Sequence, residues 1–113
     1  MKKDLEKRTK QFALAVIEFT ASLPRIREPD ILAGQLLRSS TSIGANYREA
    51  NRGVSRADFA SKIGTVQKEA SETQYWLELF IESEMLKAPP AALHIEATEL
   101  LAIFPSIGKK LKG

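Results

Sequence analysis

Five basic residues in the middle of the chain have the chemistry and spacing to bind phosphate groups. They are Arg38, Arg48, Arg52, Arg56 and Lys62. Arg38 and Arg52 fall nearly above one another on a helix, with Ala45 midway between them, and Arg48 lies on an adjacent face. Guanidinium and ammonium groups in such a row can neutralise the phosphates of a nucleic-acid backbone. The same row could instead pair with acidic side chains of another helix or subunit. The acidic candidates are Glu69, Glu72 and Glu78.

Charge is unevenly distributed along the chain, although the net charge is only +3 at pH 7. Residues 34–68 are basic, residues 69–104 are acidic, and the last residues are basic again. Two interpretations stay open. Either the basic segment faces an anionic partner such as structured RNA, or the segments neutralise each other within the chain or between subunits. Tyr47 is the only aromatic residue amid the arginines, so RNA would be bound through its backbone and shape rather than by base stacking.

Side chains suited to catalysis or metal binding are scarce. The chain has a single histidine, His94, and no cysteine, so thiolate chemistry is excluded. Glu96 is two positions away from His94, and the two side chains face different ways on a helix. Ser106 and Lys109 match a Ser-x-x-Lys spacing, but nothing supplies the remaining motifs of that enzyme class. We therefore predict a protein that is not an enzyme, with no catalytic residue, no cofactor and no bound metal.

Length and composition indicate one domain over residues 1–113. Hydrophobic residues make up 43% of the chain and charged residues 27%, which is typical of a globular protein. The N-terminal sequence MKKDLEKRTK is charged from its start, unlike a secretory signal, and no apolar run reaches the ~18 residues that would span a membrane. The lack of cysteine fits a reducing compartment, and we expect a cytoplasmic protein.

Hydrophobic periodicity predicts four helices, at about residues 4–23, 30–52, 56–86 and 90–104. Pro24 ends the first helix and Gly53 ends the second. Ser55 caps the third helix, and Asp58 completes an approximate capping box. Pro105 is expected to kink or end the fourth helix, leaving a frayed tail. Short connections place consecutive helices antiparallel, so the predicted fold class is all-α, an up-down-up-down four-helix bundle.

Two of these helices carry features beyond a single apolar stripe. The second is rich in small residues around Gly44, which costs about 1 kcal/mol of helix propensity relative to alanine, so we expect a neighbouring backbone to approach closely there. The third has a second apolar stripe in its C-terminal half, which includes Trp76 and Leu79. A helix that is apolar on two sides needs a further partner, and we predict that Trp76 and Leu79 contact another subunit.

Two strings in this region resemble a known family. They are QLLRSSTSIGANYREANRG at residues 35–53 and DFASKIGTVQKEASETQYWLELF at residues 58–80. Both are closely similar to the small four-helix bundle proteins encoded in bacterial 23S rRNA intervening sequences, also called the S23 ribosomal protein family. The Ser-Ile-Gly-Ala-Asn motif of that family, followed by Glu, matches residues 42–46 and Glu49, and its Lys-Glu-Ala-x-Glu-Thr-x-Tyr-Trp-Leu string matches residues 68–77. The likeness covers roughly residues 12–83.

The resemblance implies a bundle that assembles as a homo-oligomeric ring, typically a homopentamer. Relatives are tied genetically to rRNA, and distant ones bind RNA and a reverse transcriptase. Asn46 and Glu49 either fix the register of a helix contact or line a surface shared between subunits. We therefore expect a non-enzymatic homo-oligomer that binds structured RNA or rRNA through its basic surface. The alternative is a scaffold that binds another protein and has no role with nucleic acids.

Overall fold

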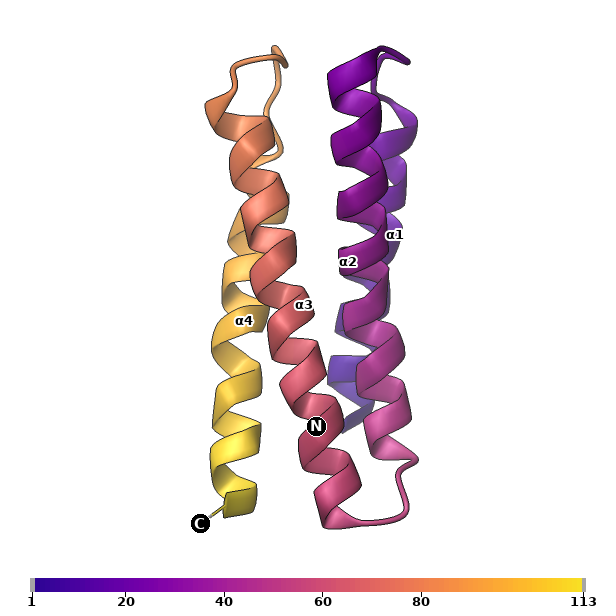
Figure 1. Ribbon diagram of the computed structural model, residues 1–113, viewed down its shortest axis with the longest axis vertical. Coiled ribbons are helices and arrows are strands. Elements are labelled where there is room, and N and C mark those ends of the chain that lie inside the picture. Colours follow the sequence, from indigo (N-terminus) through magenta and orange to yellow (C-terminus); the bar gives the residue numbers. More distant parts are fainter. Residues whose placement is uncertain (1, 113) are drawn as a thin grey trace.

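The computed structural model describes the backbone of residues 2–112 and the side chains of residues 4–107. Within this range the chain forms four α-helices: α1 (Lys2–Ala21), α2 (Arg27–Asn51), α3 (Arg56–Glu82) and α4 (Ala91–Lys112). Consecutive helices run in opposite directions (Figure 1), and the molecule measures 45 × 21 × 20 Å. Its long dimension is close to that of one long helix, because each helical residue adds about 1.5 Å. The predicted all-α four-helix bundle is confirmed.

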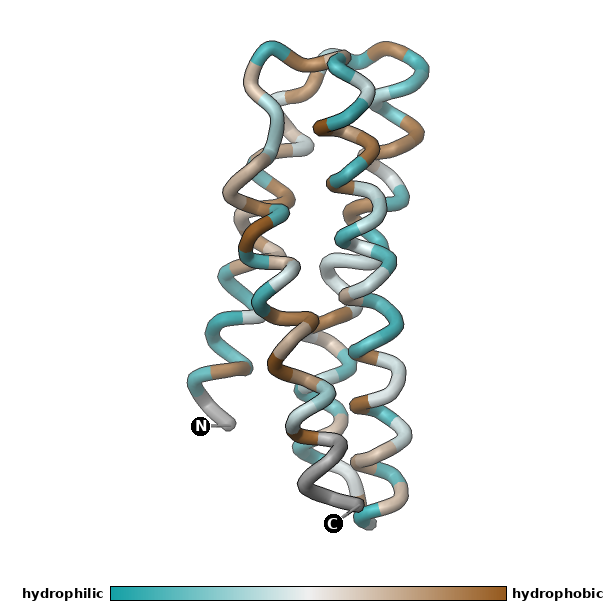
Figure 2. Tube along the Cα trace, turned by 90° about the vertical axis from the view of Figure 1, so that its left-hand side faces the viewer, coloured by the Kyte–Doolittle hydropathy of each residue, from teal (hydrophilic) through white to brown (hydrophobic). Residues whose placement is uncertain are grey.

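Each helix contributes one apolar face to a common core. Hydrophobic positions recur at short intervals along every helix (Figure 2), as expected for amphipathic helices. The largest fully buried hydrophobic side chains are Phe80, Phe104, Leu36, Ile43, Ile63, Leu77 and Leu100. Phe19 of α1 packs edge to face on Phe80 of α3, and Tyr47 of α2 on Phe104 of α4, each pair with ring centroids 5.4 Å apart. These pairs connect helices that are not consecutive. None of the helices in the described range is both long and apolar enough to cross a lipid bilayer.

The later helix boundaries differ from the sequence-based prediction. α3 ends at Glu82 rather than near residue 86, and Glu84 takes a left-handed backbone conformation with a φ of 59°. Leu86 lies in the connection after α3 and still packs on the core. Its position in the sequence therefore looks like one more apolar position of the helix. Of the two outcomes expected at Pro105, a kink or an end of the helix, the end is wrong, because α4 continues through Pro105 to residue 112. Pro105 is exposed, so water can reach the Leu101 carbonyl that loses its helical donor.

The first two helices begin earlier than predicted. α1 begins at Lys2 rather than residue 4, and α2 begins at Arg27 rather than residue 30. Ile26 precedes α2 with an extended backbone and provides no side-chain cap, so Asp30 lies inside the first turn instead of capping it. Pro29 is tolerated in that turn because a backbone N–H there has no partner within the helix.

The connection between α2 and α3 follows the predicted capping. The Ser55 hydroxyl accepts a hydrogen bond from the backbone N–H of Asp58 at 3.0 Å, which satisfies one of the donors exposed at the start of α3. Gly53 follows the end of α2, and a Cβ added there would lie 2.7 Å from the Asp58 carboxylate. A side chain at residue 53 would therefore require the Asp58 carboxylate to move, and the backbone there is not left-handed.

Small residues of α2 permit two close helix contacts. A Cβ added at Gly44 would lie 3.2 Å from the Thr9 hydroxyl and 3.5 Å from the Thr9 carbonyl carbon, so α1 does approach closely at the predicted position. On the other side of α2, the buried Thr73 hydroxyl of α3 donates to the Ser39 hydroxyl at 2.8 Å. Both side chains are fully buried. These contacts fix α2 against α1 and α3 where its own helix propensity is weakest.

Candidate nucleic-acid interface

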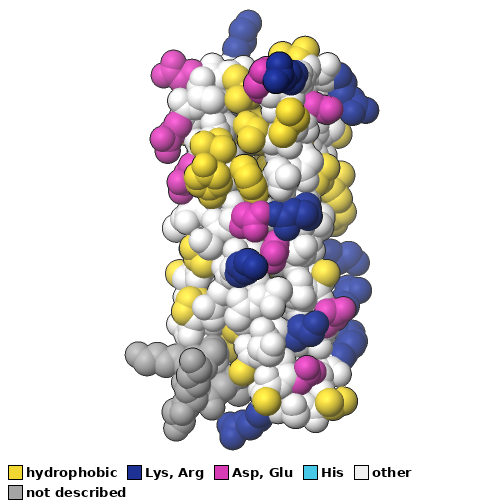
Figure 3. All heavy atoms as spheres, viewed as in Figure 1, with side chains coloured by type: hydrophobic (Ala, Val, Ile, Leu, Met, Phe, Trp, Pro, Cys, Tyr) yellow, Lys and Arg dark blue, Asp and Glu magenta, His cyan; other side chains and the backbone are white. Residues whose placement is uncertain are grey.

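Antiparallel packing gathers basic residues from three helices at one end of the bundle. The start of α1, the end of α2 and the start of α3 meet there (Figure 1). The basic side chains of this region, here called the basic end, are Lys7, Lys10, Arg48, Arg52, Arg56 and Lys62. Figure 3 shows Lys and Arg side chains along the right-hand and lower edges of the molecule. The fold thus adds Lys7 and Lys10, which lie far away in the sequence, to four of the predicted candidates.

Glu6 of α1 is the carboxylate around which part of the basic end is organised. The Asn51 side-chain amide donates to Glu6 Oε2 at 2.9 Å. Arg52 Nη1 lies 3.6 Å and Arg48 Nε 3.9 Å from Glu6 Oε1. The hydrogen bond from Asn51 lowers the pKa of Glu6 against the opposing effect of desolvation, and the charges of Arg52 and Arg48 lower it further. Glu6 therefore stays ionised at neutral pH and is shared by two guanidinium groups.

Burial of Tyr47 removes the one aromatic ring that could have stacked on bases. Only 2% of the Tyr47 surface is exposed, and its ring packs on Phe104. Desolvation raises the pKa of the Tyr47 hydroxyl, against an opposing effect of the Asn51 side chain. The residue is therefore part of the core rather than of the basic surface.

Arg38 lies apart from the basic end and is already paired with acids. Its guanidinium lies 3.3 Å from a Glu69 carboxylate oxygen and also contacts Glu72, both on α3. Half of the Arg38 side chain remains exposed. This pairing follows the acidic alternative weighed from the sequence. The predicted arginine row is divided, because α2 lies between two helices: Arg38 turns to α3, whereas Arg48 and Arg52 turn to α1.

The two basic candidates on α3 have different surroundings. Lys62 Nζ lies 3.2 Å from the Glu49 carboxylate of α2, so its charge is compensated. Arg56, the first residue of α3, is exposed and has neither an ion pair nor a hydrogen-bonded side-chain partner in the part of the chain that the structure describes. A single charged side chain with no counter-ion interacts readily with an anionic partner at no cost in broken ion pairs.

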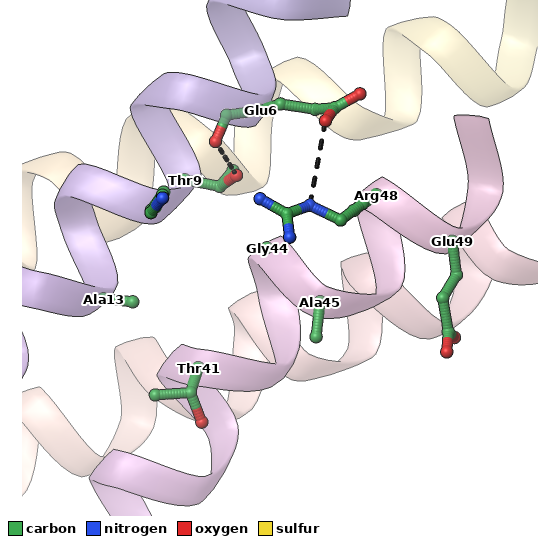
Figure 4. Close-up of a pocket in the computed structure, with 9 residues that line it drawn as sticks. Glu6, Thr9, Ala13, Thr41, Gly44, Ala45, Arg48 and Glu49 are labelled. Carbon is green, nitrogen blue, oxygen red and sulfur yellow. Dashed lines mark hydrogen bonds and ion pairs between the residues drawn. The ribbon is translucent and has the colours of Figure 1, made fainter. Parts of the chain in front are cut away.

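A groove between α1 and α2 lies beside the Glu6 cluster (Figure 4). It has a volume of about 420 Å³. Its lining residues are Glu6, Thr9, Lys10, Ala13, Thr41, Gly44, Ala45, Arg48 and Glu49. The Arg48 side chain reaches from α2 toward α1 across the groove, and its Nε faces Glu6 (Figure 4). The groove therefore combines a floor of small residues with charged walls.

Arg8 makes an ion-pair cluster that sequence reasoning missed. Its Nε and Nη2 donate to the two carboxylate oxygens of Glu96 on α4, both at 2.7 Å, and Nη2 also donates to Glu99 at 2.9 Å. These bonds raise the pKa of Arg8 further above its already high ordinary value. α1 and α4 have the smallest contact of any neighbouring helix pair, and the Arg8 cluster bridges them. No local sequence signal distinguishes Arg8 from other exposed arginines.

The remaining polar candidates are His94 and the Ser106–Lys109 pair, and the side chain of Lys109 lies outside the described residues. His94 Nε2 lies 3.2 Å from a Glu78 carboxylate oxygen across the α3–α4 contact. Within residues whose side chains are described, no group of three or more His, Cys, Asp or Glu side chains could hold a metal ion. His94 and Glu78 are thus a pair that connects two helices.

The predicted subunit-contact residues lie on α2 and α3. Trp76 is half-buried and packs on the core of its own chain, and Leu79 is also half-buried. Asn46 donates to the Ser42 carbonyl of its own helix at 2.9 Å, whereas Glu49 pairs across a helix contact with Lys62. Tyr75, whose ring packs on Trp76, and Ile31 of α2 are more exposed, at 53% and 61%. Sequence reasoning did not single out these two residues, although both are large and apolar.

Comparison with known proteins agrees with this bundle. No curated protein matches the chain. The chain is similar to the crystal structure of a protein of unknown function from the S23 ribosomal protein family of Bacteroides thetaiotaomicron VPI-5482, with 37% sequence identity and a TM-score of 0.86. That match covers 96% of this chain and 99% of the other. Residues 2–105 match the model of a family described as 23S rRNA-intervening sequence proteins. The chain therefore belongs to the 23S rRNA-intervening sequence protein family.

Proposed function

We propose that this protein is a cytoplasmic, non-enzymatic homo-oligomer that binds structured RNA through its basic end. The observation that carries the proposal is the excess of positive charge there. Arg48 and Arg52 share the single carboxylate of Glu6, and Arg56 has no acidic partner in the described part of the chain. Uncompensated guanidinium groups bind phosphates strongly and with little sequence preference.

The surroundings of the basic end favour contact with the RNA backbone rather than with bases. Tyr47 is buried, so its ring is not available for stacking beside Arg48 and Arg52. Single-stranded recognition usually relies on such platforms, whereas double-stranded RNA is recognised by shape and by phosphate and 2′-hydroxyl contacts. A structured RNA, such as a stem of rRNA, is therefore the better match.

Charge-neutralising variants at the two ends of the bundle test the RNA proposal. The basic-end variant carries Arg48→Gln, Arg52→Gln and Arg56→Gln, and the control variant carries Arg25→Gln, Arg27→Gln and Lys87→Gln near the opposite end. Both variants lose the same formal charge. We expect the basic-end variant to bind an RNA hairpin at least about tenfold more weakly and to lose about 0.7–0.9 in salt slope for each phosphate contact removed. Equal losses in the two variants would show only a general charge effect.

Exposed apolar side chains support the homo-oligomer. Tyr75 and Ile31 expose 53% and 61% of their surface on α3 and α2, and Leu14 and Ile17 expose 55% and 46% on α1. Exposed apolar side chains on different helices of one chain suit a head-to-tail contact between copies, which forms a closed ring when the rotation from one copy to the next closes. We propose such a ring, and a pentamer is the size that the family resemblance implies.

Light scattering with substituted chains tests the ring. We expect the wild-type protein to be oligomeric at micromolar concentration, and Tyr75→Lys with Ile31→Lys to shift it toward the monomer. Ile95→Lys is the matched control, because Ile95 on α4 is similarly exposed, at 59%, but is not one of the four residues named above. A monomeric wild-type protein would remove the proposal.

The paired state of Arg38 favours the alternative function for that part of the surface. Arg38 is bound to Glu69 and Glu72 of its own chain, as expected for a protein-interaction scaffold whose arginines are structural. A pull-down that retrieves a protein partner regardless of nuclease treatment, together with no RNA binding at low salt, would establish the scaffold in place of the RNA-binding protein.

A further inference from the structure

The groove between α1 and α2 holds basic groups whose hydrogen-bonding capacity is not used within the chain. Arg48 meets Glu6 only through Nε, at 3.9 Å, and its two terminal amino groups have no hydrogen-bond partner among the described side chains. Lys10 lines the same groove from α1, is exposed, and has no ion pair in the described range. Two cationic groups from two different helices thus border one concave surface.

Each acid that borders the groove also pairs with a group outside it. Glu49 pairs with Lys62 on the far side of α2. Glu6 accepts from Asn51 and is shared with Arg52 as well as with Arg48. The lining of the groove holds two acids and two bases, and Arg52 and Lys62, which pair with those acids from outside the groove, make the wider charge balance positive. A bound anion would compensate it.

The floor of the groove leaves room for such an anion. Gly44 and Ala45 are its central residues on α2, and Ala13 faces them from α1. The Thr41 and Thr9 hydroxyls donate to backbone carbonyls of their own helices. Their protons are therefore already used within the chain. With a volume of about 420 Å³, the groove accommodates a phosphate group together with part of the sugar that carries it.

We propose that this groove binds one phosphodiester group of the RNA between the Lys10 ammonium and the Arg48 guanidinium, and that Glu6 limits the affinity. The proposal rests on the proposed function, because RNA supplies the phosphate. Glu6 aims Arg48 into the groove, and its own charge opposes a second anion nearby. Removing that charge while keeping the side-chain shape therefore strengthens RNA binding, whereas removing Lys10 weakens it.

Two matched pairs of variants test the groove with an RNA hairpin at low salt. Lys10→Gln is compared with Lys87→Gln, since Lys87 is an exposed lysine near the opposite end of the bundle that lies outside both the groove and the basic end. Glu6→Gln is compared with Glu18→Gln, an exposed acid of α1 near the opposite end. We expect Lys10→Gln to weaken binding by about three- to tenfold and Glu6→Gln to tighten it by about two- to fivefold, with smaller changes in both controls.

The outcomes separate the groove from the wider function. If wild type binds RNA but each variant matches its control, the groove proposal is overturned and the RNA-binding function stands. If wild type does not bind RNA, the proposed function fails, and a titration with inorganic phosphate followed by the amide signals of Gly44 and Ala45 decides the groove. If phosphate shifts these signals in wild type but not in Lys10→Gln, the groove is a phosphate site. If the signals do not shift in wild type, the groove proposal is overturned.

Discussion

The ion pairs between Arg8 of α1 and the acids of α4 provide a sharp test of how these two helices are held together. Arg8→Met keeps most of the side-chain length and removes the charge. Two hydrogen bonds of 2.7 Å to Glu96 form a planar fork, and a third of 2.9 Å reaches Glu99. Bidentate pairs of this kind are stronger than single ion pairs. The substitution also leaves two carboxylates of α4 without their partner.

The magnitude of the effect depends on how far solvent screens these groups. The Arg8 and Glu96 side chains are 35% and 30% exposed, whereas Glu99 is 58% exposed. Hydrogen bonds to charged groups contribute about 1.5–3 kcal/mol when protected, and exposed ion pairs about 0.2–1 kcal/mol. We therefore expect Arg8→Met to lower the free energy of unfolding by about 1–2 kcal/mol. Most of this should be coupling with Glu96, and only about 0.3 kcal/mol coupling with Glu99.

Double-mutant cycles measure the two couplings separately. Arg8→Met is combined with Glu96→Gln in one cycle and with Glu99→Gln in the other, and urea unfolding is followed by circular dichroism. The chain concentration is held fixed, because self-association alters apparent stability. Lys10→Met, an exposed cation on the same helix, is the control for loss of charge. Equal coupling to both acids, or coupling to Glu96 below about 0.3 kcal/mol, would refute the reasoning.

Three further substitutions test the core and the Glu6 cluster. Phe104→Ala should lower the free energy of unfolding in urea by about 3–5 kcal/mol, because Phe104 is fully buried against Tyr47; a small loss would contradict an α4 packed in this register. Thr73→Val should cost about 1–3 kcal/mol by leaving the buried Ser39 hydroxyl without its donor, and adding Ser39→Ala should cost less than the sum of the two single changes. Because the pKa of Glu6 lies below its ordinary 4.5, its ionised form stabilises the fold above that pH. The stability advantage of wild type over Glu6→Gln should therefore shrink as pH falls from about 6 to 3, and an advantage that grows would contradict the lowered pKa.

Local chemistry was enough to predict the elements whose signals lie close together in the chain. Ser55 and Asp58 are near neighbours, and their cap depends on little else. Gly44 indicated a close helix contact because glycine in a helix is costly unless a packing reason exists. The end of α3 was mistaken because Leu86 keeps the apolar spacing while the backbone has already left the helix. Pro105 does not terminate α4, because at this exposed position water can reach the carbonyl that is left without a helical donor.

Contacts between distant segments could not be predicted in the same way. The sequence places Arg38 and Arg52 on one face of α2. Arg38 nevertheless meets an acid of α3, whereas Arg52 meets an acid of α1, because a different helix lies beside each of them. Glu6 and Lys10 join the basic end only through the antiparallel return of the chain. Arg8 meets α4 for the same reason. Composition revealed a basic segment, and the fold converts it into a basic end to which α1 contributes.

The salt dependence of RNA binding tests the central claim most directly. The dissociation constant of the wild-type protein for a structured RNA hairpin is measured at several salt concentrations between about 50 and 200 mM. With three or four phosphates contacted at the basic end, affinity should fall by roughly forty- to a hundred-and-fiftyfold over this range. No binding at the lowest salt concentration, or an affinity independent of salt, would contradict it.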